Sequence, residues 1–133
     1  MSKESDAFER ELCETLGRCG FWASIFPKAH DGSQPADIIA INKDGKHLID
    51  AKLCANGRFE FRRMEENQVS AMRLFEERAG GKGWFAVKYP DGVVYMLSQK
   101  DLELFETVLG MRSIKEIPES CELENWIYGY RDR

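Results

Sequence analysis

The sequence predicts a single α/β domain, an α+β sandwich in which helices flank a central mixed β-sheet. Three observations support this fold class: an apolar helical stripe near the N-terminus, a pair of strand patterns joined by an Asp-Gly turn, and a second pair joined through "PDG". The predicted order of elements is α-β-β-β-α-β-β-α. A chain of 133 residues is long enough for one domain with one core, which we expect to span residues 1–133.

One helix and three strands are expected in the first half of the chain. Phe8, Leu12 and Leu16 recur at helical spacing over residues 4–19, and Gly20 follows as a helix terminator. The stretches "FWASIFP", "ADIIAIN" and "KHLIDAKLC" are apolar and bounded by turn residues, so each predicts a strand.

The second half is expected to supply two more helices and two more strands. "GRFEFRR" is predicted to be extended or a loop, and helices are expected over residues 64–79 and 99–109. "GWFAVKY" and "VVYMLS" predict a hairpin between these helices. In the tail, three aromatic residues alternate as they would in a strand, and we expect them to pack: Trp126, Tyr128 and Tyr130.

Composition narrows the class of protein. With 43% hydrophobic and 32% charged residues the chain is typical of a globular protein, and no apolar run approaches the ~20 residues of a membrane span. The charged N-terminus lacks the apolar segment of a signal peptide, which predicts a cytoplasmic protein with no membrane association. The four cysteines lack CxxC spacing, which favours free thiols over a zinc site.

Charged residues lie at the edges of the two strands around Asp44-Gly45. If these two residues form the turn, Asp37 lies opposite Lys52, and Asp50 shares their face of the sheet. Asp37 and Asp50 then become diagonal neighbours at about 7–8 Å. A slip of one residue in the register would turn Asp37 to the other face.

Two predicted helices add polar groups to the same region. Glu9 borders the apolar stripe of the first helix, so it can lean over the sheet. Gln68 falls within the apolar stripe of the second helix, where its amide needs hydrogen-bond partners.

This combination of groups predicts phosphodiester hydrolysis. Carboxylates held close together repel unless a cation neutralises them, and hard oxygen ligands suit Mg²⁺. Lys52 beside them can orient an attacking water or stabilise charge on a phosphate. An acid-x-Lys triplet alone is weak support, since Asp44-Gly45-Lys46 has the same form, and a surface ion pair is the alternative interpretation of Asp50 and Lys52.

Several stretches resemble a known family of nucleases. "FERELCETLGRCGF", "HDGSQ", "PADIIAI" and "LIDAK" resemble the archaeal Holliday-junction resolvases of the PD-(D/E)XK nuclease superfamily, and "GGKGWFAVKY" is similar to a later strand of those enzymes. "FEFRRMEENQVSAM" and "GMRSIKEI" are more similar to the bacterial RecU-type resolvases. The resemblance implies a restriction-endonuclease-like αβββαβ core and a homodimeric, Mg²⁺-dependent endonuclease without an organic cofactor, with Mn²⁺ as a substitute metal.

The resemblance also assigns roles by motif position. It implies that Glu9, Asp37 and Asp50 bind the metal, that Lys52 is the catalytic lysine, and that Gln68 matches the helix glutamine of the RecU type. The chain departs from the family in two ways: Ala36 is inserted into the proline-aspartate motif, and Asp50 stands where resolvases commonly have Glu.

Contacts to DNA are expected from basic and polar side chains around this site. The net charge is −4 and the pI about 5.3, but positive residues cluster near the central hairpin. Phe59 and Phe61 are expected to pack in the core, with a dimer or DNA contact as the alternative. The candidate DNA contacts are Ser33, Lys28, His30, Lys46, Arg58, Arg62, Arg63 and Lys82.

The leading functional hypothesis is a Holliday-junction resolvase that acts on branched DNA during recombination. The first alternative keeps the nuclease chemistry but changes the substrate, as in a repair or restriction enzyme. The second is a catalytically silent DNA-binding module, in which the acids and lysine form only ion pairs.

Overall fold

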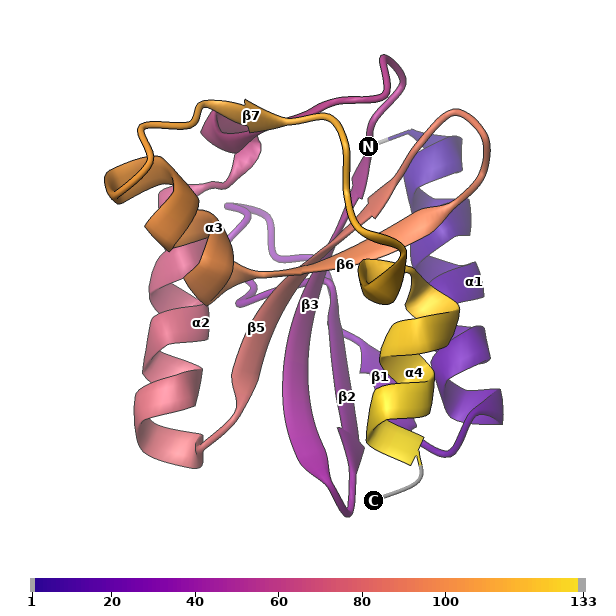
Figure 1. Cartoon of the computed structure of the whole chain (residues 1–133). Helices are drawn as coiled ribbons and strands as arrows, with labels where there is room; N and C mark the ends of the chain where they lie inside the picture. The colour runs from indigo at the N-terminus through magenta and orange to yellow at the C-terminus, as the bar shows by residue number, and fades with distance from the viewer. Residues whose placement is uncertain (1, 132–133) are drawn as a thin grey trace.

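The computed structural model describes residues 2–131 and contains a central five-stranded sheet (Figure 1). The strands run in the order β1-β2-β3-β5-β6 across the sheet. β3 and β5 are parallel and the other pairs are antiparallel, so the sheet is mixed, as predicted. The strands are β1 (Trp22–Ile25), β2 (Ile38–Asn42), β3 (Gly45–Leu53), β5 (Lys82–Lys88) and β6 (Val94–Ser98).

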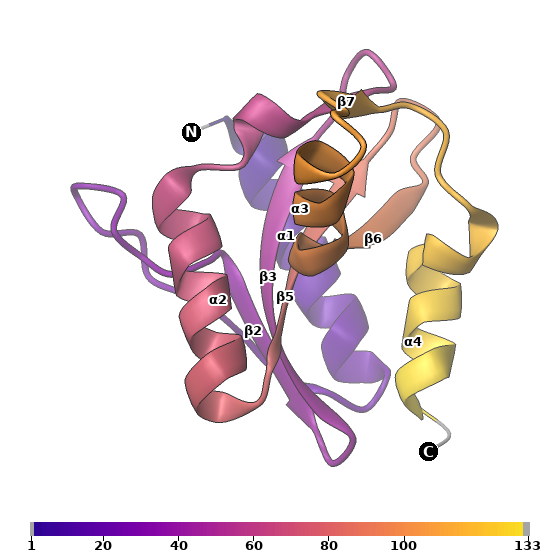
Figure 2. The same cartoon turned by 60° about the vertical axis from the view of Figure 1, so that its left-hand side comes forward.

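Four helices cover the two faces of this sheet. Figure 1 and Figure 2 show α1 and α4 on one face and α2 and α3 on the other. Within residues 2–131 no helix is long and apolar enough to cross a bilayer. The helices are α1 (Lys3–Arg18), α2 (Glu66–Ala79), α3 (Gln99–Thr107) and α4 (Leu123–Arg131), with single 3-10 turns η1 (Phe61–Arg63) and η2 (Glu119–Cys121).

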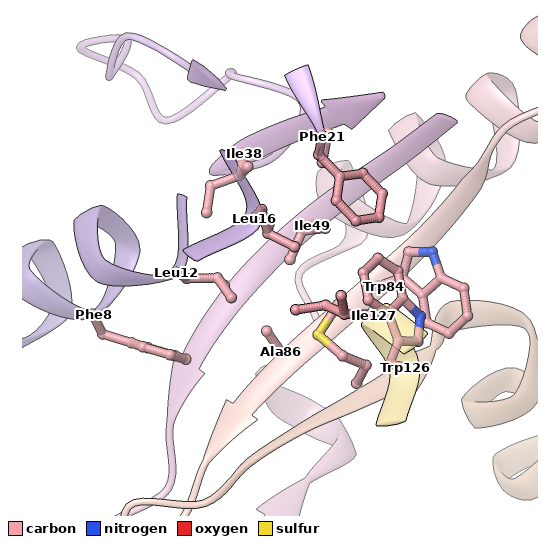
Figure 3. Packing of buried hydrophobic residues seen from close by; sticks show 12 residues of the cluster. Phe8, Leu12, Leu16, Phe21, Ile38, Ile49, Trp84, Ala86, Trp126 and Ile127 are labelled. Carbon is pink, nitrogen blue, oxygen red and sulfur yellow. The ribbon is translucent and has the colours of Figure 1, made fainter. Parts of the chain in front are cut away.

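The apolar stripe of α1 forms one of the two halves of the core. Ser2 caps the helix by accepting a hydrogen bond from the Ser5 N–H at 3.0 Å. Phe8, Leu12 and Leu16 are each at most 3% exposed and pack against the sheet (Figure 3). Burial of each of these side chains stabilises the fold by roughly 1.5–3 kcal/mol.

The C-terminal aromatic residues form a helix, so the strand-like alternation of the tail was misleading. Leu123, Trp126, Ile127 and Tyr130 recur at i, i+3, i+4 and i+7, and they pack α4 onto the same core as α1 (Figure 3). Tyr128 points away and is 68% exposed. The expected packing of the tail is therefore confirmed at Trp126 and Tyr130, whereas the strand-like alternation gave no indication of the helix that they belong to.

The segment after β3 closes the other half of the core. Phe59 and Phe61 are 0% and 2% exposed, which confirms that they are core residues. Phe59 belongs to β4 (Phe59–Glu60), which pairs with β7 (Ser113–Ile114) in a small second sheet. The alternative contacts with DNA or a partner copy are excluded for side chains this deeply buried.

The β2–β3 hairpin differs from the predicted register by one step on each strand. Lys43 and Asp44 form the turn, and Asn42 pairs with Gly45. Asn42 stabilises this turn by accepting a hydrogen bond from the Asp44 N–H at 2.9 Å. Gly45 avoids a close contact with the buried His47 ring, because an added Cβ would lie 2.9 Å from the His47 Nε2. The Asp-Gly pair was therefore a misleading turn signal.

His47 titrates in an aromatic cluster and makes stability depend on pH. The side chain is 1% exposed and accepts a hydrogen bond from the Trp84 indole N–H at 2.9 Å. Burial, and then the Lys82 charge, lower the pKa of His47 from 6.5 to about 4. Between these two pKa values His47 binds a proton in the unfolded chain but not in the folded protein. The stability that neutral His47 contributes is therefore fully present above pH 6.5 and is lost as the pH falls toward 4.

We expect the free energy of unfolding of the wild-type protein to fall by on the order of 3 kcal/mol through His47 alone as the pH falls from 6.5 to 4. The measurement is the free energy of unfolding by urea at pH 7.5 and pH 4.5, for the wild type and for His47→Gln. Gln retains an acceptor for Trp84 but does not titrate, so its acid sensitivity should be smaller. If the free energy of unfolding changed equally with pH in the two proteins, His47 would not be the source of the acid sensitivity.

Candidate active site

Asp50 and Lys52 lie on β3 with their side chains on the face that α2 covers. Ala51 between them packs against the opposite half of the core, because side chains alternate along a strand. Asp50 is 1% exposed. Its Oδ1 accepts a hydrogen bond from the Gln68 amide at 2.9 Å, and its Oδ2 lies 3.0 Å from the Lys52 Nζ.

Asp37 directly precedes β2 and is held beside Asp50 by the β3 backbone. The Asp37 N–H donates to the Ile49 carbonyl at 3.1 Å, and the Asp37 Oδ2 accepts from the Ala51 N–H at 2.8 Å. The observed register therefore brings Asp37 opposite Asp50 and not opposite Lys52. Because the shift moves the pairing by two residues, the side chains keep the predicted face.

The electrostatics of Asp50 show a carboxylate that lacks sufficient positive charge around it. Burial, and then the neighbouring Asp37 charge, raise the pKa of Asp50 to about 7, although Lys52 works in the opposite direction. The Asp50 Oδ2 is buried and accepts no hydrogen bond, since the Lys52 ammonium is near enough for an ion pair but is poorly directed for a hydrogen bond. The ion pair thus satisfies the charge of this oxygen only in part.

Glu9 reaches the site from the other helical layer through a bridging lysine. It is 5% exposed on α1, and its Oε1 lies 2.8 Å from the Lys28 Nζ. The same ammonium lies 2.7 Å from the Asp37 Oδ1. Burial raises the pKa of Glu9. Burial by itself would lower the pKa of Lys28, but the hydrogen bonds that Lys28 donates to Asp37 and Glu9 outweigh it and raise that pKa. Lys28 therefore remains protonated between the two acids.

Two of the three predicted ligands, Asp37 and Asp50, suit a divalent cation by the chemistry of their oxygens. The buried Asp50 Oδ2 without a hydrogen bond and the adjacent Asp37 carboxylate are hard oxygen donors of the kind that Mg²⁺ selects. Among the described residues, no group of three or more acidic, histidine or cysteine side chains is arranged to hold a metal. Glu9 is thus kept out of the Asp37–Asp50 pair, with Lys28 between.

Gln68 orients Asp50 from the first turn of α2. Its amide nitrogen donates to Asp50, while its Oε1 accepts from the Glu65 N–H at 3.2 Å as part of a capping box. This box begins the helix at Glu66, so Met64 precedes the helix that was predicted to include it. The contacts fit a positioning role for Gln68 in place of a catalytic one.

Two of the expected DNA contacts lie at the wrong end of the sheet. Lys46 follows the β2–β3 turn, about 13 Å along the strand from Asp50, and its Nζ donates to the Ala79 carbonyl. Lys82 pairs with His47 near the same end. Figure 1 shows this hairpin tip and the C-terminal end of α2 at the same end of the molecule, opposite β7. Neither lysine flanks the acidic pair, contrary to the expectation from the sequence.

The remaining candidates are distributed between the site and the small sheet. Arg63 donates to the Leu53 carbonyl at 2.7 Å, Arg58 contacts the Ser113 hydroxyl, and Arg62 pairs with Glu60. These bonds engage part of each guanidinium in the protein itself. Ser33 and His30 are exposed in the loop that precedes Asp37.

The sequence did not reveal one contact that holds this loop. Asn67 on α2 donates through its amide to the Gly32 carbonyl at 3.0 Å. The sequence signal for this contact was the position of Asn67 next to Gln68. Adjacent residues at the start of a helix point in different directions, so one can contact the sheet and the other a neighbouring loop. Figure 2 shows the loop extending beside the first turn of α2.

The mixed sheet, with Asp37 directly before β2 and with Asp50 and Lys52 on β3, has the arrangement of a PD-(D/E)XK nuclease. The sequence profile described as "Archaeal holliday junction resolvase (hjc)" matches residues 1–132. The chain therefore belongs to the archaeal Holliday junction resolvase family, whose members are endodeoxyribonucleases that bind branched DNA.

A solved structure shows the same fold. The Holliday junction resolvase Hjc of the archaeal hyperthermophile Archaeoglobus fulgidus superposes with a TM-score of 0.68 at 21% identity, covering 92% of this chain and 97% of that chain. This likeness confirms the predicted restriction-endonuclease-like fold. Among curated proteins, none matches the sequence.

Proposed function

We propose that the chain is a Mg²⁺-dependent resolvase in which Asp37 and Asp50 bind the metal and Lys52 assists hydrolysis. The observation that carries this proposal is the buried Asp50 carboxylate, which has Asp37 beside it and an oxygen that accepts no hydrogen bond. When bound there, a divalent cation supplies Lewis-acid stabilisation of negative charge. Mn²⁺ has the same preference for oxygen ligands and is expected to substitute.

The side chains of the site divide the remaining work. Lys52 is 13% exposed, so its ammonium can approach a phosphate oxygen and stabilise the charge that develops as water attacks phosphorus. Gln68 fixes the orientation of Asp50. Contacts that position the DNA backbone are assigned to residues near this end: Ser33, His30, Arg58, Arg62 and Arg63.

Two copies of the chain are expected to act together. Each chain carries one such site, whereas resolving a four-way junction requires two symmetric nicks. Exposed apolar residues on α3 and just after it offer a surface for pairing: Leu104, Val108 and Leu109 are 50%, 71% and 67% exposed. A homodimer is therefore part of the proposal.

The test is cleavage of an end-labelled four-way junction and of a linear duplex with matched sequence, each with Mg²⁺, with Mn²⁺ or with EDTA. We expect paired symmetric nicks in the junction alone, and only when a metal is present. Cutting of both substrates would favour a repair or restriction nuclease. Binding of the junction without cleavage under every metal condition would favour the silent DNA-binding module.

A further inference from the structure

We propose that Lys28 is a built-in counter-ion that competes with the divalent cation for Glu9 and Asp37. This inference rests on the proposed function, because it concerns the same metal site. Lys28 comes from the loop between β1 and β2, and its Nζ lies 2.8 Å from the Glu9 Oε1 and 2.7 Å from the Asp37 Oδ1. The ammonium thus lies between two carboxylates that the family resemblance assigns to the metal.

The competition is for one particular oxygen. The Asp37 Oδ2 is already held by the Ala51 N–H, so Oδ1 is the oxygen of this carboxylate that no backbone group holds, and Lys28 contacts it. A divalent cation at Asp37 would stand within a few ångströms of the ammonium. Like charges at that separation in a mostly buried site repel strongly, so binding of the metal favours departure of Lys28.

Charge balance explains why a lysine occupies this position. Glu9, Asp37 and Asp50 are all buried, and the ammonium groups of Lys28 and Lys52 are the cations paired with them. Without Lys28, Glu9 and Asp37 would have no ion pair among the described contacts. Lys28 therefore stabilises the metal-free protein and at the same time weakens its affinity for metal.

The loop that carries Lys28 is exposed to solvent. The Lys28 side chain is 32% exposed, and its neighbours Pro27, Ala29 and His30 are exposed as well. The loop is attached to α2 farther along, where Asn67 binds the Gly32 carbonyl. Lys28 can consequently turn toward solvent, while the Ala51 N–H and the Ile49 carbonyl continue to hold Asp37.

The experiment measures binding of Mn²⁺ alone, without DNA, by isothermal titration. Lys28→Met keeps the length of the side chain and removes the charge, and we expect it to bind Mn²⁺ at least about tenfold more tightly than the wild type. Lys28→Arg keeps the charge and should bind with nearly wild-type affinity. Lys88→Met is the matched control, because Lys88 is also 32% exposed but pairs with Glu11, which is not one of the three acids of the proposed metal site.

A melting experiment provides a second readout that does not depend on cleavage. In EDTA, Lys28→Met should melt below the wild type, and saturating Mn²⁺ should raise its melting temperature by more than it raises that of the wild type. Mn²⁺ binding to Lys28→Met that is no tighter than to the wild type would overturn the competition while leaving the proposed metal site intact. Absence of Mn²⁺ binding in both proteins would overturn the metal site and the competition together.

Discussion

Asp50→Asn is expected to abolish junction cleavage, by at least about a thousandfold, while junction binding persists. The amide has nearly the shape of the carboxylate but no negative charge for a cation. Gln68 can still donate to the remaining oxygen, so the local structure should survive. The measurement pairs single-turnover cleavage in Mg²⁺ with a gel-shift titration in EDTA.

The same variant should change how stability depends on pH. Because the pKa of Asp50 is raised to about 7 in the folded protein, its favourable contribution is complete below about pH 4 and is lost as the pH rises through 7. Asn cannot ionise. In EDTA, the melting temperature of Asp50→Asn should therefore gain on that of the wild type between pH 4 and pH 8.

Asp44→Asn is the matched control for this prediction. Asp44 belongs to a triplet of the same form, Asp-x-Lys, but lies in the turn at the far end of β3. Its conversion to Asn should leave cleavage unchanged. Normal cleavage by Asp50→Asn, or an equal loss in both variants, would contradict the assignment of the metal site.

Gly83→Ala is expected to be the most destabilising single-methyl change in the sheet, at roughly 3 kcal/mol. A Cβ at Gly83 would lie 2.4 Å from the Cβ and Cγ of Met72, a residue that is 1% exposed on α2. The Met72 Cβ is attached to the helix backbone, so a rotamer change cannot relieve the contact. The melting temperature should fall by roughly 10 °C.

The effect should extend from the core to the site. Met72 lies one helical turn after Gln68, so a displaced α2 carries Gln68 away from Asp50. We therefore expect Gly83→Ala to weaken Mn²⁺ binding even at temperatures where the variant is folded. Gly129→Ala is the control, because nothing lies within 4 Å of its added Cβ and the change should be neutral or stabilising. Equal stability of the two variants would refute the close approach of α2 to β5.

Much of the candidate site could be predicted because local patterns placed its residues. Asp50 and Lys52 follow from alternation along a strand, and Gln68 follows from an amide inside an apolar helical stripe. The exact partner of Asp37 could not be predicted. It depended on the turn, where the Asn42 amide donates to the Tyr130 carbonyl at 3.2 Å, a contact that comes from tertiary packing.

Lys28 shows the limit of local reasoning most clearly. In the sequence Lys28 is one basic residue in a polar loop, and a surface contact to DNA was expected for it. Its pairing with Glu9 and Asp37 joins residues 19 and 9 positions away, which meet because α1 and the start of β2 converge at one end of the sheet. Lys46 and Lys82 were misjudged for the same reason, since the sheet carries them to the other end.

The sequence by itself determined the periodic elements and the face of β3 that carries the acid and the lysine, because both depend on spacing along the chain. The tertiary structure decided the hairpin register, the helical form of the tail and the position of Lys28. In each case the deciding contacts join distant segments: Asn42 in the hairpin donates to the Tyr130 carbonyl, α4 packs on the core of α1, and Lys28 bridges two acids from different elements.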